Sequence, residues 1–256
     1  MNPDREKTLR EMGLGPVWKL RARTAAMPAE QVAVASAAVA APAIVPIPPI
    51  PPIPPIPPIP PIRSIAPPGA MAWNELAATV AACRLCRLCE ARKQAVLGVG
   101  DRNADWLFVG EGPGAEEDQR GEPFVGQAGK LLDNMLVAIG LKRGEDVYIA
   151  NAVKCRPPEN RTPTPEETAA CRPYLERQIE LIRPKLIVAL GRPAAQTLLQ
   201  TEIKIAAARG KLHDYRGIPL IVTYHPAYLL RTLLDKAKAW EDLCFMRQTM
   251  KQRKDA

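Results

Sequence analysis

Two short strings of this 256-residue chain carry residues suited to chemistry, and each follows a run of apolar, β-branched residues. The first is Gly110-Glu111-Gly112-Pro113-Gly114, and the second reads HPAYLL from His225. Loops at the ends of parallel strands are where α/β folds build their sites. Chemistry on a base of duplex DNA is one reaction that needs such a pocket, together with a wedge that holds the duplex open.

Six cysteines are spaced in a way that indicates metal or cluster ligation. Two residues separate Cys83 from Cys86, and 15 separate Cys155 from Cys171. Two local pairs brought together by folding are typical of a four-thiolate site. Cys89 gives an alternative register, in which Cys86 and Cys89 form the first pair. Spacing alone leaves both a [4Fe–4S] cluster and zinc open as the occupant.

Four short apolar runs are predicted to be strands buried on both faces, with helical segments between them. This alternation favours a parallel sheet covered by helices on both faces. Thr164 and Glu167 form a capping box that opens a helix towards Ile182, and Pro173 predicts a break in it. The strands are expected at 106–110, 147–153, 186–191 and 219–224, and further helices at 126–139, 192–199 and 240–252.

The candidate loops meet if these strands are parallel. The glycine string follows the first strand, and Asn151 lies near the end of the second. Gly191 ends the third strand, and His225 follows the fourth. All four positions then share the carboxyl edge of the sheet, where one pocket would collect them.

Residues 1–70 differ from the rest in composition and are expected to form a low-complexity region ahead of a globular domain at 71–256. Pro-Pro-Ile is repeated five times from Pro48 to Ile62. We expect disorder or polyproline II here, because a three-residue period stacks the isoleucines along one edge. A semi-rigid spacer is the main interpretation, and docking of the isoleucine edge on a protein partner is the alternative.

The chain carries a formal net charge of +8, which suits a polyanionic partner but does not prove one. Its first residues have mixed charge and lack the features of a signal peptide. The apolar run from Val32 to Val45 is too short to span a bilayer. Cysteines that ligate a metal also fit a reducing compartment. We therefore expect a cytoplasmic monomer that does not engage a membrane.

Taken in order, these motifs resemble those of the family 4 uracil-DNA glycosylases, the iron–sulfur members of their superfamily. The resemblance runs from about Ala81 to Leu243 and does not cover residues 1–70. It rests on the first cysteine pair, on Cys171 and on four strings: GEGPGAEED from Gly110, GEPFVG from Gly121, NAVKCRPP from Asn151 and HPAYLL from His225.

The resemblance implies a three-layer α/β/α fold with a four-stranded parallel sheet. It implies a monofunctional enzyme that hydrolyses the N-glycosidic bond of uracil in DNA and leaves an abasic site for repair. It also implies that a [4Fe–4S] cluster clamps loops near the DNA and that Cys89 is free. The residues that match the cluster ligands are Cys83, Cys86, Cys155 and Cys171.

The matching positions suggest how uracil would be held. His225 would donate a hydrogen bond to uracil O2 as negative charge develops on the departing base. Asn151 would read N3 and O4 through its amide, a pattern that cytosine does not match. Phe124 would stack on the ring, while the backbone of Glu111 and Gly112 would contact the base and position water.

Two positions depart from better-known members of the superfamily. Gly112 stands where those enzymes carry an aspartate that orients water. Gly114 stands where they carry a tyrosine that excludes the methyl group of thymine. Glu117 and Asp118 are candidates to assist the water, and a charged turn at a helix start is the alternative for both.

DNA handling is expected to involve a wedge and phosphate contacts. Leu229 is placed to fill the space vacated by the base, with Tyr228 or Leu230 as alternatives. The cations expected near phosphates are Lys154, Arg156, Arg161 and Arg231.

Two other functions compete with the enzyme. A non-catalytic module could sense uracil or single-stranded DNA through the same pocket, and a zinc-stabilised protein could bind nucleotides.

Overall fold

A single sheet organises the part of the chain that the structure describes. The structure is a computed structural model covering residues 71–255, so the expectations for residues 1–70 lie outside the described residues. Six strands follow in the order β1-β3-β2-β4-β6-β5. The four central strands are parallel: β2 (Trp106–Gly110), β3 (Val147–Asn151), β4 (Leu186–Leu190) and β6 (Ile218–Thr223).

The four parallel strands are those that the apolar runs predict, and the two edge strands were not predicted. All residues of β2, β3 and β4 are buried, as expected for strands covered on both faces. The predicted four-stranded sheet is extended to six by two antiparallel edge strands, β1 (Val99–Gly100) and β5 (Leu212–Tyr215). These edges lack a long apolar run, because β1 has two residues and β5 is largely solvent-exposed.

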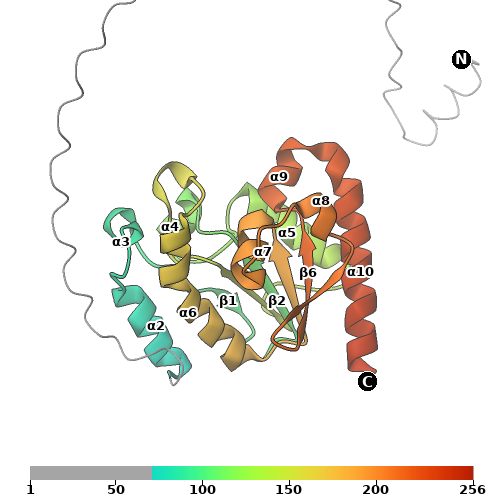
Figure 1. Cartoon of the computed structure of the whole chain (residues 1–256), viewed down its shortest axis with the longest axis horizontal. Helices are drawn as coiled ribbons and strands as arrows, with labels where there is room; N and C mark the ends of the chain where they lie inside the picture. Colours follow the sequence, from blue (N-terminus) through green and yellow to red (C-terminus); the bar gives the residue numbers. More distant parts are fainter. Residues whose placement is uncertain (1–70, 256) are drawn as a thin grey trace, which may run out of the picture. The chain divides into compact units, whose positions relative to one another are not determined.

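Helices cover both faces of the sheet, which confirms the three-layer architecture (Figure 1). Successive strand residues point to opposite faces, so Phe108 and Leu107 belong to separate cores. The helices that pack on the Phe108 face are α5 (Gln127–Ala138), α9 (Pro226–Arg231) and α10 (Lys236–Lys254). Those on the Leu107 face are α6 (Pro165–Ile182), α7 (Arg192–Leu199) and α8 (Ile205–Ala208).

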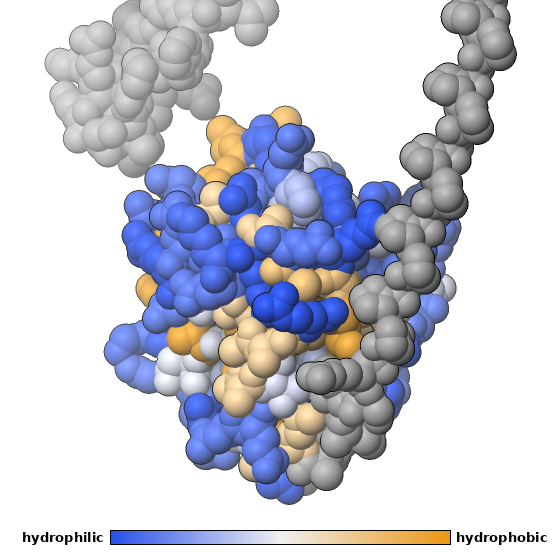
Figure 2. All heavy atoms as spheres, turned by 90° about the vertical axis from the view of Figure 1, so that its left-hand side faces the viewer, coloured by the Kyte–Doolittle hydropathy of each residue, from blue (hydrophilic) through white to orange (hydrophobic). Residues whose placement is uncertain are grey.

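A third apolar cluster lies beside the sheet, where α2 (Trp73–Ala82) and α3 (Leu88–Ala91) meet α6. Cys155 and Cys171 are buried members of this cluster. Polar residues cover most of the surface on this side of the molecule (Figure 2). The remaining short elements are α4 (Ala115–Arg120), η2 (Pro158–Asn160) and η3 (Leu233–Asp235).

Helix α6 continues through Pro173, so the predicted break is wrong. A proline removes one backbone donor from a helix, but the neighbouring turns here are held by burial of Tyr174, Leu175 and Ile179. The predicted capping box is present. The Thr164 hydroxyl accepts from the Glu167 amide, and the Glu167 carboxylate accepts from the Thr164 amide at 2.8 Å.

Between residues 71 and 255, none of the helices is both long and apolar enough to cross a bilayer.

Candidate functional site

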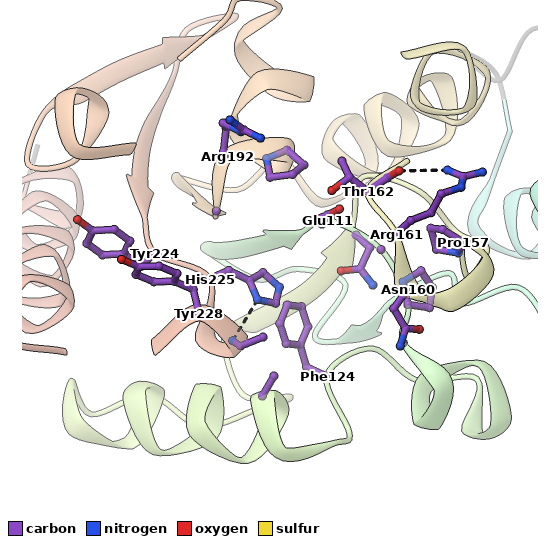
Figure 3. Close-up of a pocket in the computed structure, with 18 of the residues that line it drawn as sticks. Glu111, Phe124, Pro157, Asn160, Arg161, Thr162, Arg192, Tyr224, His225 and Tyr228 are labelled. Atoms are coloured by element: carbon purple, nitrogen blue, oxygen red, sulfur yellow. Dashed lines mark hydrogen bonds between the residues drawn. The ribbon is translucent and has the colours of Figure 1, made fainter. Parts of the chain in front are cut away.

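A cleft of about 960 Å³ opens at the carboxyl edge of the sheet, where both chemical strings meet. It is lined by the glycine string after β2, by Asn151 at the end of β3, by Gly191 after β4 and by His225 after β6. The parallel register therefore brings together the four loops that were expected to meet. Figure 3 shows His225, from the loop after β6, and Phe124, from a separate loop, pointing into this cleft.

The side chain of Asn151 has a buried oxygen atom that lacks a hydrogen-bond partner within residues 71–255. Its side chain is 2% exposed, and its Oδ1 atom is buried without a hydrogen-bond partner among the described residues. Buried acceptors are rarely left unpaired, because removing them from water is costly. Asn151 also lines the cleft, so its unpaired amide oxygen indicates a ligand with a matching N–H donor.

Phe124 is held in a strained backbone conformation beside this amide. Its φ is +55°, a region that aromatic residues rarely adopt. The Arg143 guanidinium fixes the loop by donating to the Phe124 carbonyl at 2.8 Å and to the Pro123 carbonyl at 2.9 Å. Gly129 leaves room for this loop, since a Cβ there would lie 1.8 Å from the Phe124 carbonyl oxygen. The Phe124 ring stands 5.5 Å from the His225 ring.

The hydrogen bonds of His225 leave one ring nitrogen for a ligand. Its Nδ1 atom accepts from the Ala227 amide at 3.1 Å and caps α9 (Figure 3). Burial, assisted by the charge of Arg231, lowers the pKa of His225 to about 4. The ring is therefore neutral at pH 7, and its proton is on Nε2 because Nδ1 is an acceptor. His225 can donate a hydrogen bond into the cleft without carrying a charge.

The two carboxylates proposed to assist water are already occupied by backbone groups. Glu117 lines the cleft, but its oxygens accept from the amides of Gly114, Val125 and Gly126 at 2.9–3.1 Å. Asp118 is 2% exposed and accepts from the Lys93 amide at 3.0 Å. Both side chains hold loops in place, which favours the alternative of a charged turn at a helix start.

Glu111 is the cleft carboxyl that is free of such duties. No backbone amide of residues 71–255 donates to its carboxyl group, and Thr162 and Arg192 line the same cleft. Burial raises the pKa of Glu111, while Thr162 and Arg192 act in the opposite direction. Its carboxyl group is thus a better proton acceptor than an exposed one, provided that it is ionised. Sequence reasoning assigned a role only to the backbone of this residue.

Cations line the rim of the cleft, although not all of those that were expected. Arg161 and Arg231 line it, but Arg161 is also held by two hydrogen bonds to Glu167. Lys154 is 1% exposed, so the expectation that it contacts phosphates is wrong. Arg156 does not line the cleft and donates to Asn160. Sequence reasoning missed Arg192 and Lys204, both exposed on the rim, because neither lies in a recognisable motif.

The structure corrects the placement of Leu229. This side chain is 1% exposed and packs in the core formed with α5 and α10, because it lies on the inward face of α9. The exposed leucines of this region are Leu230, Leu233 and Leu234, the last of them 90% exposed. They surround the turn between α9 and α10, at the top of the molecule in Figure 1, and Figure 2 shows apolar atoms at that end.

The cysteines meet in a second cavity, enclosed by α2, α3, the segment after β3 and α6. Its lining includes all four expected ligands and also Cys89. Two donors already point at sulfur atoms: the Arg92 guanidinium lies 2.8 Å from the Cys155 Sγ atom, and the Lys154 amide 3.2 Å from the Cys171 Sγ atom. N–H groups that face sulfur are typical of the surroundings of iron–sulfur clusters.

Two observations test whether these residues suit a cluster. The Tyr174 hydroxyl, which lines the cavity, is buried without a hydrogen-bond partner in the described structure. In residues 71–255, no three His, Cys, Asp or Glu side chains converge closely enough to hold a single metal ion. A mononuclear zinc needs thiolates about 2.3 Å from one point, whereas a cluster is held by thiolates that stand further apart. The four sulfur donors, together with the N–H groups that face them, suit a thiolate-bound cluster.

Comparison with known proteins shows which family the chain is similar to. A sequence model of the uracil DNA glycosylase superfamily matches residues 97–244. A type-4 uracil-DNA glycosylase of Archaeoglobus fulgidus is 48% identical over 165 residues, which are 61% of this chain and 82% of that protein. One of Thermotoga maritima is 50% identical over 151 residues, 58% of this chain and 78% of that protein. A type-5 enzyme of Pyrobaculum aerophilum is 36% identical over 146 residues, 51% and 64% of the two chains.

The protonation of His225 can be tested by NMR, with His213, the second histidine of the chain, as an internal reference. We expect a neutral His225 ring with its proton on Nε2 at pH 7 and still at pH 5.5, because its pKa is about 4. The unfolded chain binds this proton at about pH 6.5, so the stability that His225 contributes is lost as the pH falls from about 6.5 towards about 4. An imidazolium signal from His225 at pH 6 would contradict this assignment.

Proposed function

The chain belongs to the uracil DNA glycosylase superfamily, and on this premise we propose how its two sites divide the work. It is a uracil-DNA glycosylase, a DNA-repair hydrolase that acts on the N-glycosyl bond of uracil. The cleft at the carboxyl edge of the sheet binds the base, and the cysteine cavity holds the loops around it.

One observation carries the assignment of the cleft, the unpaired Oδ1 atom of Asn151. Uracil presents an N–H donor at N3 beside a carbonyl acceptor at O4, which pairs with the oxygen and the nitrogen of one amide. Cytosine presents the reverse pattern at these positions and would leave the buried amide unsatisfied. Phe124 supports the assignment, because its ring offers a stacking surface next to Asn151.

His225 acts on the departing base. Breaking the glycosidic bond leaves negative charge on uracil, and a donor fixed near O2 stabilises that charge. A neutral imidazole supplies this hydrogen bond through Nε2 without needing to lose or gain a proton. The Ala227 amide already holds the imidazole ring in place through Nδ1, so little conformational entropy of the ring is lost when the base binds.

Glu111 positions the attacking water. Positive charge develops on the sugar as the bond breaks, so a nearby carboxylate stabilises it electrostatically and can accept a proton from water. The carboxyl group of Glu111 lies in the cleft and no described backbone amide donates to it. The backbone of Gly112 lies at the same wall of the cleft.

The cysteine cavity holds a [4Fe–4S] cluster in this proposal, in preference to zinc. Cys83, Cys86, Cys155 and Cys171 are the ligands, and the Arg92 guanidinium and the Lys154 amide donate to the sulfur atoms of Cys155 and Cys171. The cluster supplies cross-linking between α2, α6 and the segment after β3; hydrolysis of a glycosidic bond transfers no electrons. Thiolate ligands persist in a reducing compartment, so we also propose a cytoplasmic location. A monomeric state stays a prediction.

A labelled oligonucleotide with one uracil, cleaved by alkali after incubation, tests the activity. We expect cutting at uracil and none at matched thymine or hypoxanthine. Asn151→Ala should lower the rate about 10- to 100-fold, since a bidentate contact to a base contributes roughly 1–3 kcal/mol. If the cluster-loaded wild-type protein binds the oligonucleotide and leaves it intact, the chain is a binding module.

Single cysteine variants distinguish the ligands. Ala at position 83, 86, 155 or 171 should abolish the visible absorption of thiolate-bound iron and destabilise the fold, because each removes one of four anchors. Cys89→Ala should retain both the absorption and the bound iron. Loss of iron in Cys89→Ala together with retention in Cys83→Ala would establish the other register, and zinc in the purified protein would replace the cluster assignment.

We further propose that the leucines at the α9–α10 turn open the duplex. Leu233 and Leu234 are 63% and 90% exposed, and they follow Arg231, which lines the cleft. Exposed apolar side chains flanked by cations are the usual means of unstacking bases. The wedge role expected of Leu229 is assigned to these residues instead, because Leu229 is buried in the core.

The double variant Leu233→Ala, Leu234→Ala should lower uracil excision from duplex DNA about tenfold, because unstacking a base costs a few kcal/mol. Excision from single-stranded DNA should stay close to wild type, since that substrate needs no opening. Leu212→Ala is the matched control, because Leu212 is 55% exposed on the edge strand β5. Equal losses on both substrates would show that these leucines do not act as a wedge.

A further inference from the structure

Lys154 is a fully buried lysine that the proposed mechanism leaves without a role. It lies three residues beyond Asn151 and directly before Cys155, and it is 1% exposed. Within the described range, no carboxylate pairs with it, and its ammonium nitrogen instead contacts Asn151 and Gln178. Burying a lysine without a carboxylate partner is costly, so its presence here indicates a specific role.

The side chain of Lys154 completes the end of strand β3. On its outer side, β3 is covered by β1 only as far as Ile149 and Tyr148. The carbonyl of Asn151 lies beyond this cover, and the Lys154 Nζ atom donates to it at 2.7 Å. Lys154 thus supplies the hydrogen bond that a longer neighbouring strand would have given, at the residue that carries the base-reading amide.

The second contact of Lys154 anchors it to the helical layer. Its Nζ atom donates to the side-chain carbonyl of Gln178, a residue of α6 that is fully buried. The Gln178 amide nitrogen in turn donates to the Leu97 carbonyl at 2.9 Å. These bonds fix the lysine in one place, so that its position sets the position of the Asn151 backbone.

The backbone of Lys154 belongs to the cysteine cavity. Its amide donates to the Cys171 Sγ atom, and the residue lines the cavity together with Cys83 and Cys86. One residue therefore touches the cysteine site through its main chain and the base-reading strand through its side chain. With a cluster bound, the thiolates of Cys155 and Cys171 would lie nearby and would supply the negative partner that Lys154 lacks among the described carboxylates.

We propose that Lys154 is a positioning residue that ties the cysteine site to the base-reading amide of Asn151. The inference rests on the proposed function, in which Asn151 reads uracil and the cysteines hold a cluster. Its consequence is that occupation of the cysteine site tightens uracil recognition through this lysine.

Lys154→Met in the cluster-loaded, full-length protein tests the proposal. We expect the visible absorption to be retained, while the inhibition constant of free uracil and the KM for uracil-containing DNA rise together, about tenfold or more, because a buried carbonyl loses its donor. The kcat should change less, since Asn151 contacts the base both before and during bond breakage. Unchanged uracil inhibition in a variant with full visible absorption would overturn the proposal.

Two further variants separate positioning from stability. Met250→Ala on α10 removes buried apolar contacts on the opposite face of the sheet from Gln178 and should lower the melting temperature with uracil inhibition unchanged. Gln178→Leu removes one acceptor of Lys154, and it replaces Lys154→Met as the test if that variant does not fold. It should weaken inhibition by uracil. Wild-type inhibition in Gln178→Leu would refute the positioning role of Lys154. A wild-type protein that releases no uracil would instead refute the proposed function.

Discussion

The site depends on one point of close approach at the edge of the sheet. Gly110 ends β2 and faces Asn151 at the end of β3 in the parallel register. A Cβ atom at position 110 would lie 2.4 Å from the Asn151 Oδ1 atom and 2.5 Å from the Phe124 ring. The absence of a side chain there lets the amide and the ring share the floor of the cleft. A strand that ends in glycine is thus what allows two recognition groups from separate loops to stand side by side.

Sequence patterns predicted the centre of this fold better than its borders. The four parallel strands are mostly apolar because both faces of the sheet are covered, and such runs are easy to see in a sequence. β1 and β5 are held by pairing with a neighbour and not by burial, so they leave no apolar signature. The break expected at Pro173 did not form, because a proline removes one hydrogen bond whereas burial acts on every turn of α6.

For the site, the sequence predicted which loops meet but not which way some of their side chains point. Strand order placed Asn151 and His225 in one cleft, since loops after parallel strands meet at one edge of the sheet, and the family resemblance added Phe124. It did not reveal that Leu229 points inward or that Lys154 is buried, because both depend on packing partners distant in sequence. Arg192 and Lys204 line the rim but lie in no sequence motif, so only the structure identifies them.

His225 has a structural role as well as a place in the cleft, and this affects what its removal would reveal. Its Nδ1 atom caps α9, the helix that leads to the exposed leucines, while its other nitrogen is free for the cleft. A substitution at this position therefore frees a helix end as well as removing a donor. A kinetic defect measured on such a variant is a composite quantity, and dividing it between chemistry and duplex handling requires a replacement such as asparagine, which is itself a favourable helix cap.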